Sequence, residues 1–335
     1  MDKIMTNCER MGINPKWPKY KNVVARIQKE PIAFDLGLKY IHEYITREDA
    51  SPTKLLPNKL NSMTAEPERH GRYKADETLA LAPDNPQWLA DLAHWTRYYQ
   101  VGVGQDFFWH HRFRIIFPDH PRGGLFMFSM EYASTMMAVM ALLGWRDAAV
   151  YQGYLIHAAL NRNYQLVLEY QDEHRRAQAF MLRLFALWVG DASHIWPAYA
   201  YDEPIYEALL QHWRTPDPQD LVPCLLAACD RHTHQTNKDT LKNFFDFNNV
   251  GLTRTPIEIL FLFRLREWEG LDNPVLDHPL MARPFDQLPP VQPMPELDEL
   301  MQGVLRRARE DWPQYDEVLS LDALKQSAQT LTLRP

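Results

Sequence analysis

The sequence predicts an all-α fold, a multi-helix bundle around a central buried apolar helix with at most a few short strands. Three observations lead to this prediction. Apolar side chains recur at helical spacing over most of the 335 residues, and one apolar run is long enough to fill the middle of a bundle. The alternation of apolar and polar residues that a half-buried strand requires is confined to one short stretch.

The N-terminal region predicts one helix and a long connector. Pro31 stands where a first helical residue would, and apolar residues follow it on one helical face as far as Ile45. Residues 50–85 are polar and contain four prolines, so we expect them to connect rather than to pack.

A second helix is expected to begin at Asn85-Pro86, because large apolar side chains recur after it at helical spacing. They are Trp88, Leu92, Trp95 and Tyr99. The glycines at positions 102 and 104 predict its end. Residues 112–117 alternate in part and predict a short strand.

Residues 125–145 form an apolar run in which Glu131 is the only charged residue. Its length is that of a membrane span, which needs roughly 20 apolar residues. Several polar residues lie in its first half, and no Lys/Arg-rich loop flanks it. We therefore predict the buried central helix of the bundle, and no membrane partner.

The later part of the chain continues the helical pattern. Helices are expected over residues 147–170, 172–189, 204–213 and 217–229, and over residues 296–311 after a proline-rich extended stretch at 284–295. The clearest local signal is Thr255-Pro256-Ile257-Glu258, where Thr255 and Glu258 would form a capping box. Gly270 is the expected end of that helix.

Length and composition suit a globular chain of one or two domains. We divide it into an N-terminal helical segment and connector (1–84), a main helical domain (85–283), and a Pro-rich linker with a C-terminal helix (284–335). Three cysteines are too few for a disulfide framework, so Cys224 and Cys229 are expected to be buried free thiols. With no apolar signal segment at the N-terminus, a reducing cytoplasm is the expected compartment.

Charge is divided unevenly along the chain. Residues 1–75 carry 14 Lys/Arg against 9 Asp/Glu, a net charge of +5, whereas the remaining residues carry 22 against 34, a net charge of −12. An acidic body repels phosphate, so direct nucleic-acid binding is not expected. A basic protein partner suits this balance better.

Acidic residues gather where predicted helices meet. The residues expected to contact a partner are Glu169, Asp172, Glu173, Asp202 and Glu203. Capping and solubility are the alternative explanation for each, because carboxylates favour helix N-termini by roughly 0.3–1 kcal/mol. Glu169 fits that explanation least well, since it lies near a predicted helix C-terminus.

Motifs for catalysis or cofactor binding are missing. No His has a Glu three residues before it, as a di-metal helical site requires, although Asp91-His94 and Asp191-His194 have the same spacing with Asp. Residues 102–104 lack the third glycine of a dinucleotide fingerprint. We therefore expect no enzyme activity, no metal and no cofactor.

The stretch from Arg264 to Met281, RLREWEGLDNPVLDHPLM, with the Leu-Pro-Pro after it, resembles the C-terminal region of bacterial immunity proteins. These are encoded beside secreted polymorphic toxins, including type VI secretion effectors. The helical, acidic body is similar too, most of all to the immunity partner of a type VI nuclease effector in a Pseudomonas-like bacterium. The resemblance implies a cytoplasmic protein that binds and neutralises a cognate toxin, and the toxin it implies is a nuclease with a basic surface.

Two other functions remain open on the sequence. A helical metalloenzyme would use the ligands Asp91, His94, Asp191 and His194. A chaperone or adaptor for a secreted effector would instead hold its client in an exposed apolar groove.

Overall fold

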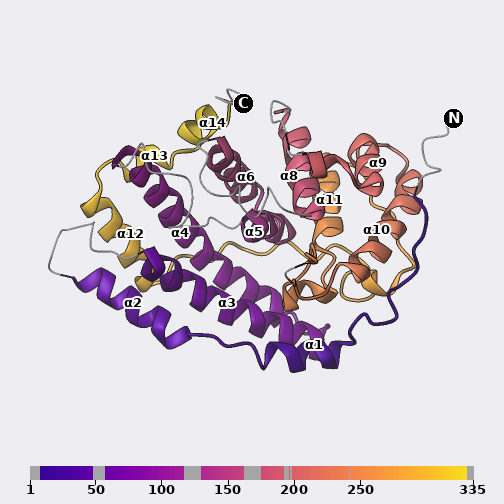
Figure 1. Cartoon of the computed structure of the whole chain (residues 1–335), viewed down its shortest axis with the longest axis horizontal. Coiled ribbons are helices and arrows are strands. Elements are labelled where there is room, and N and C mark those ends of the chain that lie inside the picture. Colours follow the sequence, from indigo (N-terminus) through magenta and orange to yellow (C-terminus); the bar gives the residue numbers. More distant parts are fainter. Residues whose placement is uncertain are drawn as a thin grey trace.

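The computed structural model describes residues 8–47, 57–116, 130–161, 175–191, 196, 198–240 and 242–329. Within these ranges the chain forms helices and no strand, so the predicted all-α fold is confirmed (Figure 1). The helices, with the labels of Figure 1, are α1 (Tyr20–Ile27), α2 (Phe34–Thr46), α3 (Pro57–Leu81), α4 (Gln87–Ile116), α5 (Met130–Leu142), α6 (Arg146–Asn161), α8 (Arg176–Val189), α9 (Pro204–His212), α10 (Val222–His234), α11 (Ile257–Trp268), α12 (Glu299–Asp311), α13 (Tyr315–Val318) and α14 (Leu321–Gln329). Short 3-10 helices are η3 (Ala198–Tyr201), η4 (Pro218–Leu221), η5 (Val250–Arg254) and η6 (Pro279–Met281).

Helix α5 is the centre of the bundle, as predicted. It packs against α4, α6, α8 and α11, and Figure 1 shows it surrounded by them. Residues 136–143 are each at most 4% exposed. The first residues of the predicted central helix, 125–129, lie outside the described residues. Among the residues that are described, no helix is both long and apolar enough to cross a bilayer.

The connector predicted at residues 50–85 is wrong, because residues 57–81 form helix α3, which runs antiparallel against α4. Two glycines permit the close approach. A Cβ on Gly71 would lie 1.9 Å from the Trp95 ring, and one on Gly102 would lie 2.0 Å from the Thr64 hydroxyl. Pro67 lies inside α3, where proline removes one helical hydrogen bond, and contacts with α4 and α2 compensate for this loss.

Helix α4 also corrects two predictions. It continues through Gly102 and Gly104 to Ile116, so the strand predicted at residues 112–117 is wrong over residues 112–116, and residue 117 lies outside the described residues. Glycine weakens a helix by only about 1 kcal/mol relative to alanine. The packing that Gly102 makes possible against α3 outweighs that cost.

Helix α11 begins without the predicted capping box. Pro256 occupies the N-cap position, and no side-chain capping hydrogen bond forms at this helix start. Glu258 is fully buried and turns instead to His232, whose Nδ1 lies 2.9 Å away. The predicted end is confirmed: Gly270 has φ 75°, and the Leu271 amide donates to the Arg266 carbonyl at 2.9 Å, as in a Schellman motif.

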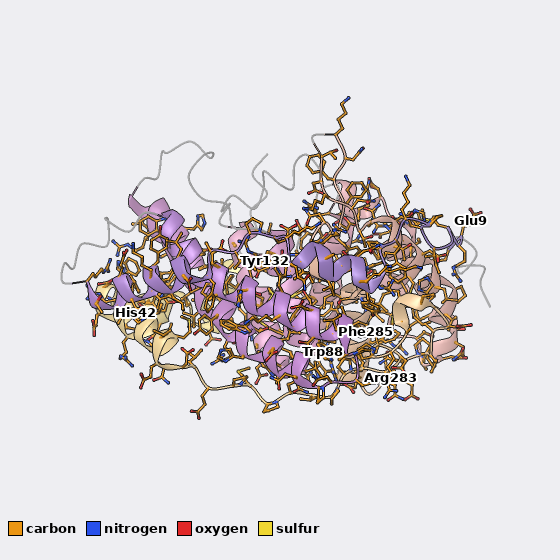
Figure 2. The ribbon with its side chains drawn as sticks, turned by 90° about the horizontal axis from the view of Figure 1, so that it is seen from below. Glu9, His42, Trp88, Tyr132, Arg283 and Phe285 are labelled. Atoms are coloured by element: carbon orange, nitrogen blue, oxygen red, sulfur yellow. A yellow bond between two sulfur atoms is a disulfide. The ribbon has the colours of Figure 1, made fainter. Side chains whose placement is uncertain are left out.

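The proline-rich stretch contains no helix, but residues 284–287 form a turn and bends, so the prediction that the whole stretch is extended is wrong at its start. The stretch forms a strap from the α11 end of the molecule to α12 (Figure 1). Phe285 packs edge-on against Trp88 at its start, and the two rings lie together in Figure 2. Farther along, the Gln292 amide donates to the Leu143 carbonyl at 2.9 Å, and the Trp145 indole donates to the Gln292 carbonyl at 2.8 Å. The strap thereby fixes the end of α5.

The N-terminal arm, residues 8–18, lies along α10. A disulfide joins Cys8 to Cys224, so the prediction of a free thiol at Cys224 is wrong, whereas Cys229 is a buried free thiol. Sequence spacing gave no sign of this pair, because its members are 216 residues apart. Residues from all three predicted segments, from Ala75 to Ala328, contribute to one hydrophobic core.

Candidate partner-binding surface

Two of the five predicted contact residues, Asp202 and Glu203, lie at the start of α9, and each has an intramolecular partner. Asp202 forms an ion pair with Arg176 of α8 at 2.8 Å. Glu203 forms one with Arg231 of α10 at 2.6 Å and caps α9 through the Ile205 amide. The other three lie outside the described residues: Glu169, Asp172 and Glu173.

These pairs belong to a set of contacts that joins α8, α9 and α10. Glu207 continues it through an ion pair with Arg183. Because an arginine offsets each of these carboxylates, the α9 entry presents less negative charge than its sequence indicates. The two pairs that α8 makes with Asp202 and Glu207 are partly exposed, and such ion pairs contribute about 0–1 kcal/mol each.

A buried carboxylate, Asp246, fixes the same three-helix corner from within. It is fully buried and accepts hydrogen bonds from the amides of Arg176 and Ala177, the first residues at the start of α8. Arg231 lies 2.6 Å from it. Burial alone would lower the pKa of Arg231, but Asp246 and Glu203 outweigh burial and raise it. Arg231 therefore keeps its charge in the core.

Asp230, the residue before Arg231, ties the N-terminal arm and the segment after α11 to α10. Arg10 donates two hydrogen bonds to its carboxylate, and the Gly12 amide donates a third at 3.0 Å. His278 Nε2 lies 3.2 Å from the same carboxylate. Burial alone would raise the pKa of Asp230, but these donors hold it below its usual value.

A different group of acids faces solvent at the turn after α11. We define the η4–α11 acidic surface as the exposed residues Asp217, Asp220, Glu269, Asp272 and Asp277. The buried Arg266 joins the segment before η4 to the segment after α11 by hydrogen bonds. Its guanidinium donates to the carbonyls of Trp213 and Thr215 on one side and to that of Asp272, at 2.5 Å, on the other.

Two arginines offset part of this surface, because Arg214 lies beside Glu269 and the buried Arg266 interacts electrostatically with Asp272. Asp217 and Asp220 accept hydrogen bonds from the neutral groups of Gln219 and Thr215. Arg214 lies 3.6 Å from Glu269, and within the described ranges no ion pair involves the side chains of Asp272 or Asp277. The segment 274–280 alternates between buried and exposed residues, which presents Asp277 and an apolar residue, Val275, 81% exposed, to solvent.

The sequence prediction missed Asp272 and Asp277. Predicted helix ends guided the choice of acids, whereas these two follow the end of α11 in an extended segment. The available signal was the stretch 264–281 itself, which contains both residues and carries the resemblance to immunity proteins.

Three further carboxyl groups have raised pKa values and were not predicted. Burial raises the pKa of Glu68 to about 7 and that of Asp76 to about 6, both on the inner face of α3. Burial also raises the pKa of Asp106 on α4 to about 7. Arg72 lies between the two α3 acids, with its Nε 3.3 Å from Glu68. Glu68 is only 1% exposed, so a substrate could not reach it. Its raised pKa instead affects the stability of the fold.

The alternative metal site gains no support within the described ranges. Asp91 accepts a hydrogen bond from Gln87, His94 packs against Trp95, and His194 lies outside those ranges. Among the residues that are described, no three His, Cys, Asp or Glu side chains converge as a metal ion would require.

Comparison of the chain with protein-family models, with curated proteins and with solved structures finds no match.

Proposed function

We propose that this chain is an immunity protein, which binds a cognate secreted toxin and neutralises it by direct contact. The toxin class that fits best is a nuclease with a basic surface, delivered by a type VI secretion system. One observation carries the proposal: the stretch with the resemblance, residues 264–281, supplies three of the five carboxylates of the η4–α11 acidic surface.

The electrostatic argument supports a basic partner. Exposed carboxylates with few paired cations attract a positively charged surface, and complementary charge raises association rate constants from about 10⁵–10⁶ to as much as 10⁸–10⁹ M⁻¹s⁻¹ at low salt. Fast capture matters when the toxin acts inside the cell that must survive it. Val275, which is 81% exposed in the same segment as Asp272 and Asp277, adds an exposed apolar side chain.

The compartment is part of the proposal. We place the complex in the cytoplasm, where a nuclease would act. The Cys8–Cys224 disulfide is of a kind found mainly in oxidising compartments. The cysteine count therefore no longer argues for the cytoplasm, and cell fractionation has to decide.

The test begins with the genes beside this one. Each neighbouring open reading frame is expressed from an inducible promoter, with and without this chain, and colony survival is counted. We expect one product to be lethal alone and tolerated with the chain, and the purified pair to form a complex. The proposal fails if no neighbour is toxic or if the chain does not restore survival.

Charge reversal then tests the surface. Asp272→Lys with Asp277→Lys should slow association and reduce its salt dependence. The matched control is Glu310→Lys with Asp322→Lys, two exposed acids on α12 and α14. Reversal of Asp202 and Glu203 tests the predicted contact residues, with thermal unfolding recorded because both have ion-paired partners.

A further inference from the structure

A second site lies apart from the η4–α11 acidic surface, and none of its lining residues belongs to that surface. It is a pocket of about 300 Å³ between α4, α5 and α6 on one side and α12 and α13 on the other. Figure 1 shows how these helices are arranged. That volume is at the lower end of small-molecule sites, about 300–1,000 Å³.

Most of the pocket wall is apolar. Its apolar side chains are Val101, Val103, Met140, Leu297, Leu305 and Leu319. Gly104 is part of the wall, and a Cβ there would come within 3.3 Å of the Tyr315 hydroxyl. A larger residue at position 104 would therefore occupy space that the glycine leaves open.

One positive charge lines this pocket without a negative partner. Arg97 donates through Nε to the Pro295 carbonyl at 2.9 Å and through Nη1 to the Gln100 side chain, and both acceptors are neutral. No carboxylate of the described residues pairs with it, and burial lowers its pKa. A partly buried charge that lacks a counter-charge is costly, which favours an anion beside it.

Two further polar residues, Gln152 and Arg309, line the pocket. Gln152 is 1% exposed and uses its amide nitrogen on the Tyr99 hydroxyl and the Ala133 carbonyl, whereas its amide oxygen accepts no hydrogen bond within the described ranges. Arg309 and Asp316 also line the pocket and pair with each other at 2.8 Å. Arg97 is therefore the cation available to a ligand.

We propose that this pocket binds a small organic anion with an apolar body, its carboxylate at Arg97 and its chain against the valine, leucine and methionine side chains. A guanidinium and a carboxylate form short, charge-assisted hydrogen bonds. The site is independent of toxin binding, because its residues belong to other helices than the acidic surface.

Isothermal titration of the full chain with three probes tests this site. Octanoate has both the anion and the apolar chain, 1-octanol has the chain alone, and inorganic phosphate has the anion alone. We expect octanoate to bind at least tenfold more tightly than octanol, and phosphate not to bind. Absence of octanoate binding at millimolar concentration, or equal affinity for octanol, overturns the proposal.

Variants locate the site. Arg97→Gln should reduce octanoate affinity at least tenfold and leave octanol binding unchanged, while Arg97→Lys, which keeps the charge, should retain affinity within a few-fold. Gly104→Leu should reduce the binding of both. Arg214→Gln, at the distant surface, is the matched control. Circular dichroism verifies each fold, and unchanged octanoate affinity in folded Arg97→Gln contradicts the assignment.

Discussion

Glu68 illustrates how a single buried carboxyl group couples folding to pH. Its pKa is about 7 in the folded chain because burial disfavours the charged form, whereas an exposed glutamate titrates near 4.5. The folded chain therefore holds a proton that the unfolded chain releases between these values. The stability that this proton contributes is fully present below about pH 4.5 and is lost as pH rises through about 7.

We predict that Glu68→Gln flattens this dependence. Between pH 5 and pH 8 the free energy of unfolding of the variant should rise relative to the wild type by on the order of 2–3 kcal/mol, because glutamine does not titrate. Urea unfolding at several pH values measures it. Glu310→Gln, an exposed acid on α12, should run parallel to the wild type. Parallel curves for Glu68→Gln would falsify the burial argument.

Local sequence rules also fail at single residues when a tertiary partner competes. Glu258 has the spacing of a capping-box residue, yet it lies against His232 in the core. A capping bond contributes about 1 kcal/mol, whereas an unpaired buried imidazole or carboxylate costs more. The buried pair therefore determines where the side chain goes.

At the scale of elements, α3 shows why periodicity can miss a helix. Its buried residues include five polar or small ones, Thr64, Glu68, Gly71, Arg72 and Ala75, among the larger Met63, Tyr73 and Leu79. The polar and small residues weaken the hydrophobic pattern, and Pro67 argues against a helix interior. Helix α5, by contrast, is apolar and buried on nearly every side from Met136 to Leu142, so its sequence predicts it directly.

The α3–α4 contact makes a specific prediction at this scale. Gly71→Ala should lower the free energy of unfolding by about 1–3 kcal/mol, because the added methyl group overlaps the Trp95 ring and overpacking of this kind is costly. Lys74→Ala, exposed on the same helix, is the control. Chemical denaturation measures both, and a Gly71→Ala chain as stable as the wild type contradicts the close approach.

At the scale of the whole molecule, the N-terminal arm closes the chain on itself. The Cys8–Cys224 disulfide encloses most of the main helical domain, and Arg10 and Gly12 reach the buried Asp230 beside it. A cross-link over so long a loop stabilises chiefly by restricting the unfolded chain.

We therefore predict that Cys8→Ser lowers the stability of the oxidised protein by about 2–4 kcal/mol. The measurement is urea unfolding without reductant. In dithiothreitol the wild type and Cys8→Ser should unfold at the same urea concentration, which serves as the control. Equal midpoints under oxidising conditions as well would show that the disulfide contributes nothing.

The sequence by itself determined the all-α class, the buried α5, the end of α11 at Gly270 and the non-helical, proline-rich strap. These features depend on patterns within about 20 consecutive residues, such as apolar spacing, glycine at a helix end and a run of prolines. Only the tertiary structure decided that α3 packs on α4, that Cys8 meets Cys224, and that Asp202 and Glu203 pair with arginines while Asp272 and Asp277 face solvent. The physical reason is that each of these outcomes depends on residues far apart in the chain, whose proximity no local pattern encodes.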